Sequence, residues 1–423
     1  MFALLRQRNF GLLWFGGLIS MIGDWMLRIA LPAYVYDLTG STLATGLMFM
    51  VSTLPSIVLG SVAGVFVDRW DRQRTMVIIN LILAATLLPL LLVRSTEWLW
   101  LVYVVAFAES LVGQFFGPAE NALLPNLVGE EHLMGANSLN ALNNNLARLI
   151  GPALGGVIGL TLGLSGVVVV DVVTYLAAAV LIALIRQPQK ERVAAAVPSS
   201  VLTSSFTKVW REWLAGLSLI HQNRPVFLLF ILFMMTSVGE GIMVTLFIPF
   251  VTEVLRGQAL EIGWLMSAQA VGGILGGLVI ARMGTRLKPH HLIGPSGILF
   301  GLIDLAIFNY PALIPGFTLA LVLFVLVGLP GAAYSASIST LLQNQVQDEY
   351  RGRVFGALST TMSLLVLVGM GFASVAGDRL GIVPVINVQG FGYVLAGTVA
   401  WLILRPHIAS LVPTVLLPSE EQV

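Results

Sequence analysis

Residues 64–74 read GVFVDRWDRQR, a short basic turn between two long apolar segments. Those segments, residues 43–68 and 74–95, are each long enough for a helix to cross the hydrocarbon core of a bilayer, which takes about 20 residues. An acidic side chain, Asp68, ends the first segment, and an arginine follows it directly. The stretch therefore predicts two transmembrane helices that are joined at one face of the membrane.

Apolar segments of this length recur along the whole chain and predict twelve transmembrane spans. They run over residues 10–37, 43–68, 74–95, 98–122, 136–162, 166–186, 224–253, 260–282, 289–309, 314–342, 351–378 and 383–405. The composition agrees, since 57% of the 423 residues are hydrophobic and 10% are charged, against about 45–50% and about 25% in soluble domains. We expect an all-α membrane protein. We expect no cleaved signal peptide, because the first span carries Asp24 and Arg28 and lacks a small-residue cleavage site.

Basic residues gather on one side of the predicted membrane. With the N-terminus inside, 17 lysines and arginines lie on the inner side, and three, Arg94, Arg256 and Arg379, lie on the outer side. Cytoplasmic loops carry an excess of such residues, so we expect a multi-pass protein of the cell (inner) membrane with both termini in the cytoplasm. The net charge of +1 gives no indication of a nucleic-acid partner.

The two halves of the chain resemble each other. Residues 20–32 resemble 236–249, and residues 124–133 match 342–351 at an offset of 218. Two similar six-span halves are typical of transporters with alternating access, whose substrate site lies where the repeats meet. We therefore expect two six-helix repeats around a central cavity.

A long polar stretch separates these halves. The predicted division is residues 1–186 for the N-terminal half, 187–223 for a cytoplasmic linker, 224–405 for the C-terminal half and 406–423 for a cytoplasmic tail. Within the linker, residues 206–221 place Val209, Trp213, Leu217 and Ile220 at helical spacing. This pattern predicts an amphipathic helix on the membrane surface, and a solvated connector is the alternative.

The turn at 64–74 resembles the loop between spans 2 and 3 of the major facilitator superfamily, whose pattern is G-x-L-a-D-r-x-G-r-x-r. The residues that fill this pattern are Gly64, Asp68, Arg69, Arg72 and Arg74, and Asp71 stands where glycine is usual. The resemblance implies a cytoplasmic gate held by charge-assisted bonds that form in one conformation and break in another. A second copy, from Gly277 to Arg286, has Ala281 at the aspartate position and implies a weaker gate. A simple positively charged anchor would explain the arginines but not Asp68.

The fifth span carries a second motif, formed by Gly151, Pro152, Gly155 and Gly156. Small residues let helices approach closely, and proline permits bending. The motif resembles the G-P-x-x-G-G element of drug:proton antiporters and favours export. Residues 8–14, 31–40, 116–128 and 171–175 resemble the macrolide-efflux-like branch, which is itself similar to siderophore exporters and lysophospholipid transporters.

Carboxylates within the spans are the candidates for proton coupling, because they are costly in a bilayer unless paired or hydrated. Counting residues from the outer span ends places Asp24, Glu109 and Glu240 near the midplane, roughly 16–20 Å deep at 1.5 Å per residue. Glu240 is the strongest candidate, since no basic residue lies near it on its own span. Asp171 and Asp304 lie nearer the span ends, where interfacial or packing roles suffice. The five histidines fall in or beside loops, so no histidine relay is expected.

Two arginines within spans are the expected charge partners. Arg28 shares a helix face with Asp24, and Arg148 is the expected counter-ion for Glu109. Arg148 belongs to a predicted polar stripe on the fifth span, together with Asn137, Asn140, Asn144, Gly151 and Gly155. The alternative is that these groups are structural pairs between packed helices.

The resemblance also implies that spans 1, 4, 7 and 10 line a central cavity. The candidate lining residues are Trp25, Phe107, Phe116, Met243 and Tyr334, although residues of these types more often belong to ordinary helix packing. We expect a proton-coupled secondary transporter that exports amphiphilic small molecules. The alternatives are a lysophospholipid or siderophore carrier and a non-transporting membrane sensor or scaffold.

Other classes of protein fit the sequence poorly. The chain has no nucleotide-binding P-loop, no hydrolase or metalloprotease motif and no cysteine. We therefore expect no enzyme, no catalytic residue, no metal and no cofactor. The expected partners are a small amphiphilic substrate, protons and the lipid bilayer, and the expected state is a monomer.

Overall fold

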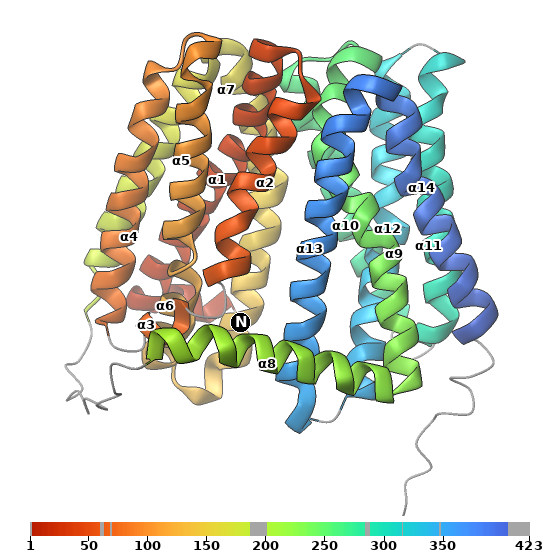
Figure 1. Cartoon of the computed structure of the whole chain (residues 1–423). Coiled ribbons are helices and arrows are strands. Elements are labelled where there is room, and N and C mark those ends of the chain that lie inside the picture. The colour runs from red at the N-terminus through yellow and green to blue at the C-terminus, as the bar shows by residue number, and fades with distance from the viewer. Residues whose placement is uncertain are drawn as a thin grey trace, which may run out of the picture.

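The computed structural model describes residues 2–59, 63–67, 70–186, 201–283, 288–314, 316–346 and 348–404. In these ranges every regular element is a helix. Figure 1 shows two upright groups of helices side by side, and one further helix, α8, lies across one end of both groups. We call this end of the molecule the α8 end and the opposite one the distal end.

The first group contains α1 to α7. Their bounds are α1 Arg8–Thr39, α2 Thr42–Leu59, α3 Ala63–Val67, α4 Arg72–Leu87, α5 Leu99–Gly113, α6 Phe116–Val128 and α7 Leu133–Ala183. Short 3₁₀ turns at Phe2–Arg6, Leu88–Leu92, Thr96–Trp98 and Glu130–His132 accompany them. We refer to this group as the N-terminal half.

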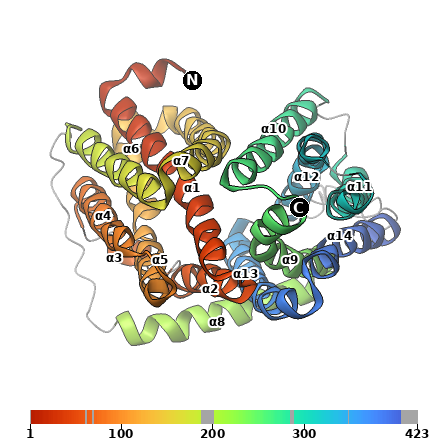
Figure 2. The ribbon, with the colours of Figure 1, turned by 90° about the horizontal axis from the view of Figure 1, so that it is seen from above.

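The second group, the C-terminal half, contains α9 to α14. Their bounds are α9 Arg224–Pro249, α10 Ala259–Met283, α11 Pro289–Asn309, α12 Phe317–Gln345, α13 Asp348–Leu380 and α14 Ile382–Val399. Helix α8, Val201–Gln222, precedes it. The view from above shows α2 of the N-terminal half beside α13 of the C-terminal half (Figure 2).

Among the described residues, ten helical stretches are long and apolar enough to cross a membrane, and Thr42–Ile57 is a shorter apolar helix. One of the ten, Leu133–Ala183, is interrupted at Gly163, which has a φ of 66°. Glycine adopts this left-handed conformation without a steric penalty, and it separates the predicted spans 136–162 and 166–186. The structure therefore confirms an all-α membrane fold with twelve transmembrane helices in two groups of six.

The fourth span differs from the prediction, because it is broken. Helix α5 ends at Gly113 and α6 begins at Phe116, although residues 98–122 were expected to form one helix. Pro118 lacks the N–H that a continuous helix would direct at the carbonyl of Gln114, and proline is tolerated in the first turn of a new helix. The break follows Glu109 by one helical turn.

Each half has its own hydrophobic core. In the C-terminal half, Phe250, Phe308 and Phe324 are among the largest fully or nearly fully buried side chains. The N-terminal half holds two hydrophobic clusters, one toward the distal end and one toward the α8 end. Ile29 and Tyr36 of α1 nevertheless pack into the core of the C-terminal half, so the halves are joined along the distal part of α1.

Helix α8 contains the residues that were predicted to form a helix on the membrane surface. Trp213 donates its indole N–H to the Thr361 hydroxyl at 3.2 Å, and Leu217 and Ile220 pack on the core of the C-terminal half. The apolar face of α8 therefore packs on protein at these positions, and the placement of this helix on the membrane surface stays a prediction. Val209 and the linker residues 187–200 lie outside the described side chains.

Candidate functional site

A carboxylate in the middle of α1 pairs with a tyrosine of α7. The Tyr175 hydroxyl donates a hydrogen bond to the Asp24 carboxylate. Gly23, the preceding residue, packs against the side chains of Asp171 and Thr174. A residue without a side chain is needed there, because it lets the two helices approach closely.

The C-terminal half repeats this arrangement. The Tyr393 hydroxyl of α14 donates to the Glu240 carboxylate of α9, and Gly239 packs against Gln389. Tyr393 follows Tyr175 by 218 residues, the offset already found between the halves. Sequence reasoning missed these two tyrosines as partners of the acids, and the shared offset was the signal that could have found them.

Two further carboxylates lie close to these pairs. Asp171 is 0% exposed and Asp304 is 3% exposed. Asp171 interacts electrostatically with Asp24 and Glu109. Asp304 interacts electrostatically with Glu240. The prediction of interfacial or packing roles rested on counting residues from span ends. Counting along single helices could not place Asp171 near Asp24, because that relation arises where the Asp171 side chain packs on Gly23 of α1.

Trp25 lies between two guanidinium groups. Its ring centroid is 5.4 Å from Cζ of Arg28 and 6.0 Å from Cζ of Arg148. Such cation–π contacts contribute about 0.5–1 kcal/mol at exposed sites. Both arginines have exposed side chains, and within the described ranges neither forms an ion pair within 4.0 Å.

The charge partners differ from those expected. Glu109 is attracted electrostatically by the guanidinium of Arg28 and repelled by the like charge of Asp24. Arg148, predicted as the counter-ion of Glu109, instead acts on Glu240 in the other half. The sequence could not show this relation, because it depends on how the two halves are docked.

The glycines of the fifth-span motif form two different contacts. Gly151 and Gly155 pack on the backbone of α1, where a Cβ atom at position 155 would lie 2.8 Å from both Cα and O of Met26. Gly156 faces the other half, and its Cβ atom would lie 2.6 Å from the carbonyl oxygen of Ala259 in α10. The carbonyl of Pro152 packs against Gly263 of the same helix. The motif thus permits close packing both within and between the halves.

The structure describes only part of the gate motif. Gly64 belongs to α3, whereas Asp68 and Arg69 lie outside the described residues. Arg72 donates to the backbone carbonyl of Ala122 in α6 at 2.7 Å. Asp71, which departs from the family pattern, accepts from the backbone N–H of Arg74 at 2.9 Å and so caps the first turn of α4.

The members of the predicted polar stripe form different contacts. Asn140 donates to Glu120 of α6 at 3.2 Å, and Asn144 donates to the carbonyl of Asn140 on its own helix at 3.4 Å. Asn137 is exposed. Asn143, which was not in the stripe, is buried and donates to the carbonyl of Trp14 at 2.9 Å.

The candidate lining residues lie in different surroundings. Phe107 is 40% exposed, and Phe116 and Met243 are partly buried against the cores of their halves. Tyr334 is only 6% exposed, and its ring centroid lies 5.5 Å from that of Tyr393. In this conformation it therefore belongs to the core around the Glu240 pair rather than to an open surface.

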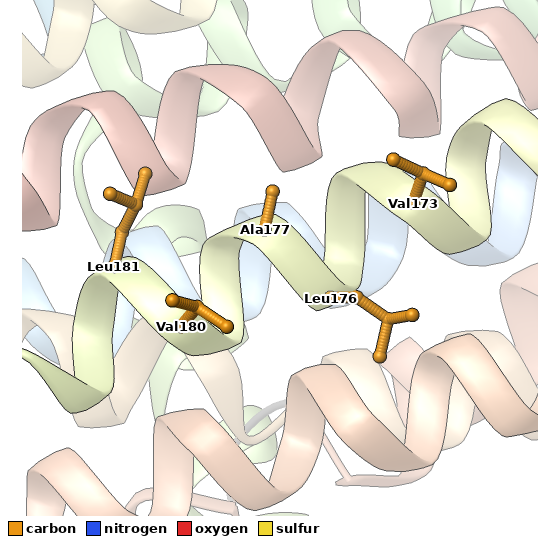
Figure 3. Close-up of a pocket in the computed structure, with 5 residues that line it drawn as sticks. All are labelled: Val173, Leu176, Ala177, Val180 and Leu181. Atoms are coloured by element: carbon orange, nitrogen blue, oxygen red, sulfur yellow. The ribbon is translucent and has the colours of Figure 1, made fainter.

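An apolar hollow lies on α7 (Figure 3). It is lined by Val173, Leu176, Ala177, Val180 and Leu181. Val173, Leu176 and Val180 are all exposed. None of the candidate lining residues of the substrate cavity borders this hollow, so it is distinct from the predicted substrate site.

Contacts between the halves lie in the distal part of the molecule. Tyr36 donates to Glu253, and Thr42 donates to Asp378 through its backbone N–H at 3.0 Å and its hydroxyl at 2.7 Å. On the other side of the bundle, Ser267 donates to the carbonyl of Leu149 at 2.8 Å. These bonds hold the distal ends of the halves together.

Comparison with known proteins agrees with this architecture. Residues 1–409 match the transmembrane secretion effector family. The chain is 28% identical over 379 residues to macrolide efflux protein A of Streptococcus pyogenes, covering 88% of this chain and 90% of that protein. It is 27% identical over 406 residues to the multidrug efflux pump Tap of Mycolicibacterium fortuitum, covering 93% and 95%.

A solved structure shares the fold. The crystal structure of a bacterial homologue of the iron transporter ferroportin, in an inward-facing state, superposes with a TM-score of 0.74 at 16% identity. The superposition covers 93% of this chain and 98% of that one. This membrane protein is a transporter rather than an enzyme, and the chain belongs to the transmembrane secretion effector family of the major facilitator superfamily.

Proposed function

We propose that this transporter exports amphiphilic small molecules from the cytoplasm in exchange for protons. The observation that carries the proposal is the repeated acid–tyrosine pair, Asp24 with Tyr175 and Glu240 with Tyr393. Each half thus holds one titratable group at the same place in its fold. The names of the efflux relatives support export.

The chemistry follows from the cost of charge in a bilayer. A carboxylate there is expensive unless it is paired or hydrated, and in the described part of the chain neither Asp24 nor Glu240 forms an ion pair within 4.0 Å. Such a group is neutral when enclosed and ionises when water reaches it. Because the two conformations expose the group to opposite sides, it can carry a proton one way while substrate moves the other.

We further propose that residues 1–186 and 224–405 move as two units in the cell membrane, with both termini in the cytoplasm. The excess of basic residues on one side supports this orientation. The distal end is then the outer end, and the contacts there describe an inward-facing state. Trp25, Phe107, Phe116 and Met243 are the proposed substrate contacts.

Reconstituted protein tests the function directly. Proteoliposomes with an imposed pH gradient should accumulate amphiphilic compounds, and collapse of the gradient should abolish the accumulation. A compound panel that includes lysophospholipids and siderophores separates the alternative carriers by their uptake. Absence of flux for every compound would favour a sensor or scaffold.

Removing the distal hydrogen bonds should open that end. Asp378 accepts from Thr42 and also from the Ser41 hydroxyl at 3.2 Å. Hydrogen bonds to a charged group contribute about 1.5–3 kcal/mol. We therefore expect Asp378→Ala to shift the ratio of distal-closed to distal-open molecules by about tenfold or more.

The chain has no cysteine, so spin labels can be placed at Trp98→Cys and Leu313→Cys near the distal end. Asp37→Ala is the matched control, since it removes an exposed carboxylate at the same end. A distance distribution in Asp378→Ala that equals that of the control would contradict the assignment of these bonds to the closed state.

The gate motif gives a separate prediction. Asp68→Asn should leave insertion intact, because neutralising a carboxylate at a span end scarcely changes hydropathy. It should slow transport by removing charge-assisted bonds that favour one conformation. Transport rates and labelling at Met134→Cys measure the effect, and Asp37→Asn provides the same chemical change at the other end. Unchanged transport and labelling would remove the gating role.

A further inference from the structure

We propose that Asp171 and Asp304 are additional proton-binding residues of the transport cycle, so that each half holds a further proton-binding carboxyl group beside its acid–tyrosine pair. The inference rests on the proposed proton coupling. It assigns a role to two buried acids that neither the antiporter motif nor the acid–tyrosine pairs use.

In the N-terminal half, the evidence is the incomplete bonding of Asp171. Its Oδ1 atom accepts a hydrogen bond from the Thr174 hydroxyl at 3.0 Å. Its Oδ2 atom is buried and has no hydrogen-bond partner among the described residues. The charged groups that act on it, Asp24 and Glu109, are both acidic.

In the C-terminal half, Asp304 is in the same situation. Its Oδ2 atom is buried and lacks a hydrogen-bond partner within the part of the chain that the structure describes. The charge that acts on it is that of Glu240, and its own charge acts on Tyr393, the partner of Glu240. A different helix, α11, supplies this second acid, so the pairing recurs without a matching sequence position.

An ionised carboxylate is not stable in either position. A buried charge without a counter-ion or a full set of hydrogen bonds is strongly unfavourable, and a neighbouring carboxyl group that is ionised repels it further. Both groups therefore hold a proton in this conformation. Gln389 supports this reading, because this neutral amide occupies the position that follows Asp171 by 218 residues and packs on Gly239 as Asp171 packs on Gly23.

The second acid in each half alters the proton binding of the first. Two interacting carboxyl groups titrate as a pair, and the binding of protons belongs to the pair rather than to one residue. When the halves rearrange and water reaches the site, a pair can release more protons than a single acid. We therefore expect the proton count per transported substrate to depend on Asp171 and Asp304.

The number of coupled protons can be measured in proteoliposomes. At zero membrane potential, the logarithm of the limiting accumulation ratio rises with the pH difference with a slope equal to that number, since each pH unit supplies a factor of about ten per proton. We expect Asp171→Asn and Asp304→Asn each to lower the slope by one. At a difference of one pH unit, the limit then falls about tenfold. The isosteric amide should preserve folding and substrate exchange at equal pH.

Asp37→Asn is the control, because it removes an exposed carboxylate outside the clusters, and its slope should equal that of the wild type. An unchanged slope in Asp171→Asn and Asp304→Asn, with exchange retained, would overturn the proposal. If the wild type accumulates nothing in a pH gradient, the proposed function fails as well. Those two failures are therefore distinguishable.

Infrared spectroscopy of the purified protein gives a readout that does not depend on transport. Isotope labelling of aspartate identifies the C=O band of protonated aspartic acid at neutral pH in the wild type. We expect part of this band to disappear in Asp171→Asn and part in Asp304→Asn. Absence of the band from the labelled wild type would overturn the proposal even if a variant failed to fold.

Discussion

Glu240→Gln should weaken substrate accumulation driven by a pH gradient while leaving substrate exchange at equal pH intact. Glutamine keeps the shape of the side chain and can still accept the hydrogen bond that Tyr393 donates. It cannot load or release a proton. A difference of one pH unit supports about tenfold accumulation for each coupled proton, and in the variant the contribution of this site should be lost.

Paired assays measure this effect, one of exchange at equal pH and one of uphill transport with an imposed gradient. Glu97→Gln is the matched control, because it makes the same chemical change at an exposed position. Accumulation that depends on the pH difference in Glu240→Gln as it does in the wild type would transfer the coupling role to Asp24 or Glu109. Loss of exchange as well would favour a structural or substrate-binding role for Glu240.

Neutralising Asp24 should have a different effect from neutralising Glu240. Asp24→Asn removes a negative charge close to Arg28, which already lacks an ion-pair partner within 4.0 Å in the described ranges. A charge left without compensation in a membrane protein is costly, so this variant should impair exchange as well as coupling. Glu240→Gln should be the more selective change.

Gly155→Leu should prevent folding or arrest the transport cycle. The added Cβ atom would lie 2.8 Å from the backbone of Met26, closer than two such atoms can approach. Backbone atoms cannot rotate away as a flexible side chain can, so α1 and α7 must separate. Overpacking alone costs about 1–3 kcal/mol for extra methylenes in a core, and a clash with backbone costs more.

Expression level, size-exclusion profile and transport rate measure this outcome. Gly273→Leu is the matched control, since a Cβ atom on this α10 glycine has open space around it, and it should fold and transport as the wild type does. A Gly155→Leu protein that folds and retains full activity would show that the close approach of α1 and α7 is dispensable.

The periodic features of the chain were predictable from the sequence. Apolar segments of membrane-spanning length and the internal offset of 218 residues predict twelve helices in two repeats, because a bilayer demands helices and a repeat implies similar halves. The close helix packing at the glycines of the fifth span was also predictable from the sequence. The break between α5 and α6 had a local signal as well, in Gly113 and Pro118.

Relations between helices required the tertiary structure. Nothing local distinguishes Tyr175 and Tyr393 from other aromatic residues of apolar helices, and only docking brings each against an acid. The partner of Arg148 was misassigned for the same reason, since Glu240 lies in the other half. A side chain has neighbours on its own helix at steps of three and four, but its neighbours on other helices depend on crossing points and depths.

Asp171 shows this limit most clearly. Along its own span it lies near an end, and the sequence therefore predicted a packing role. In the folded protein α7 packs along α1, and the fully buried Asp171 carboxylate lies against Gly23, next to Asp24. The length and hydropathy of each helix are properties of the sequence alone, because they follow from the local transfer of side chains into lipid. Which carboxylates share an enclosed site follows from helix crossings, and those depend on the packing of all twelve helices together.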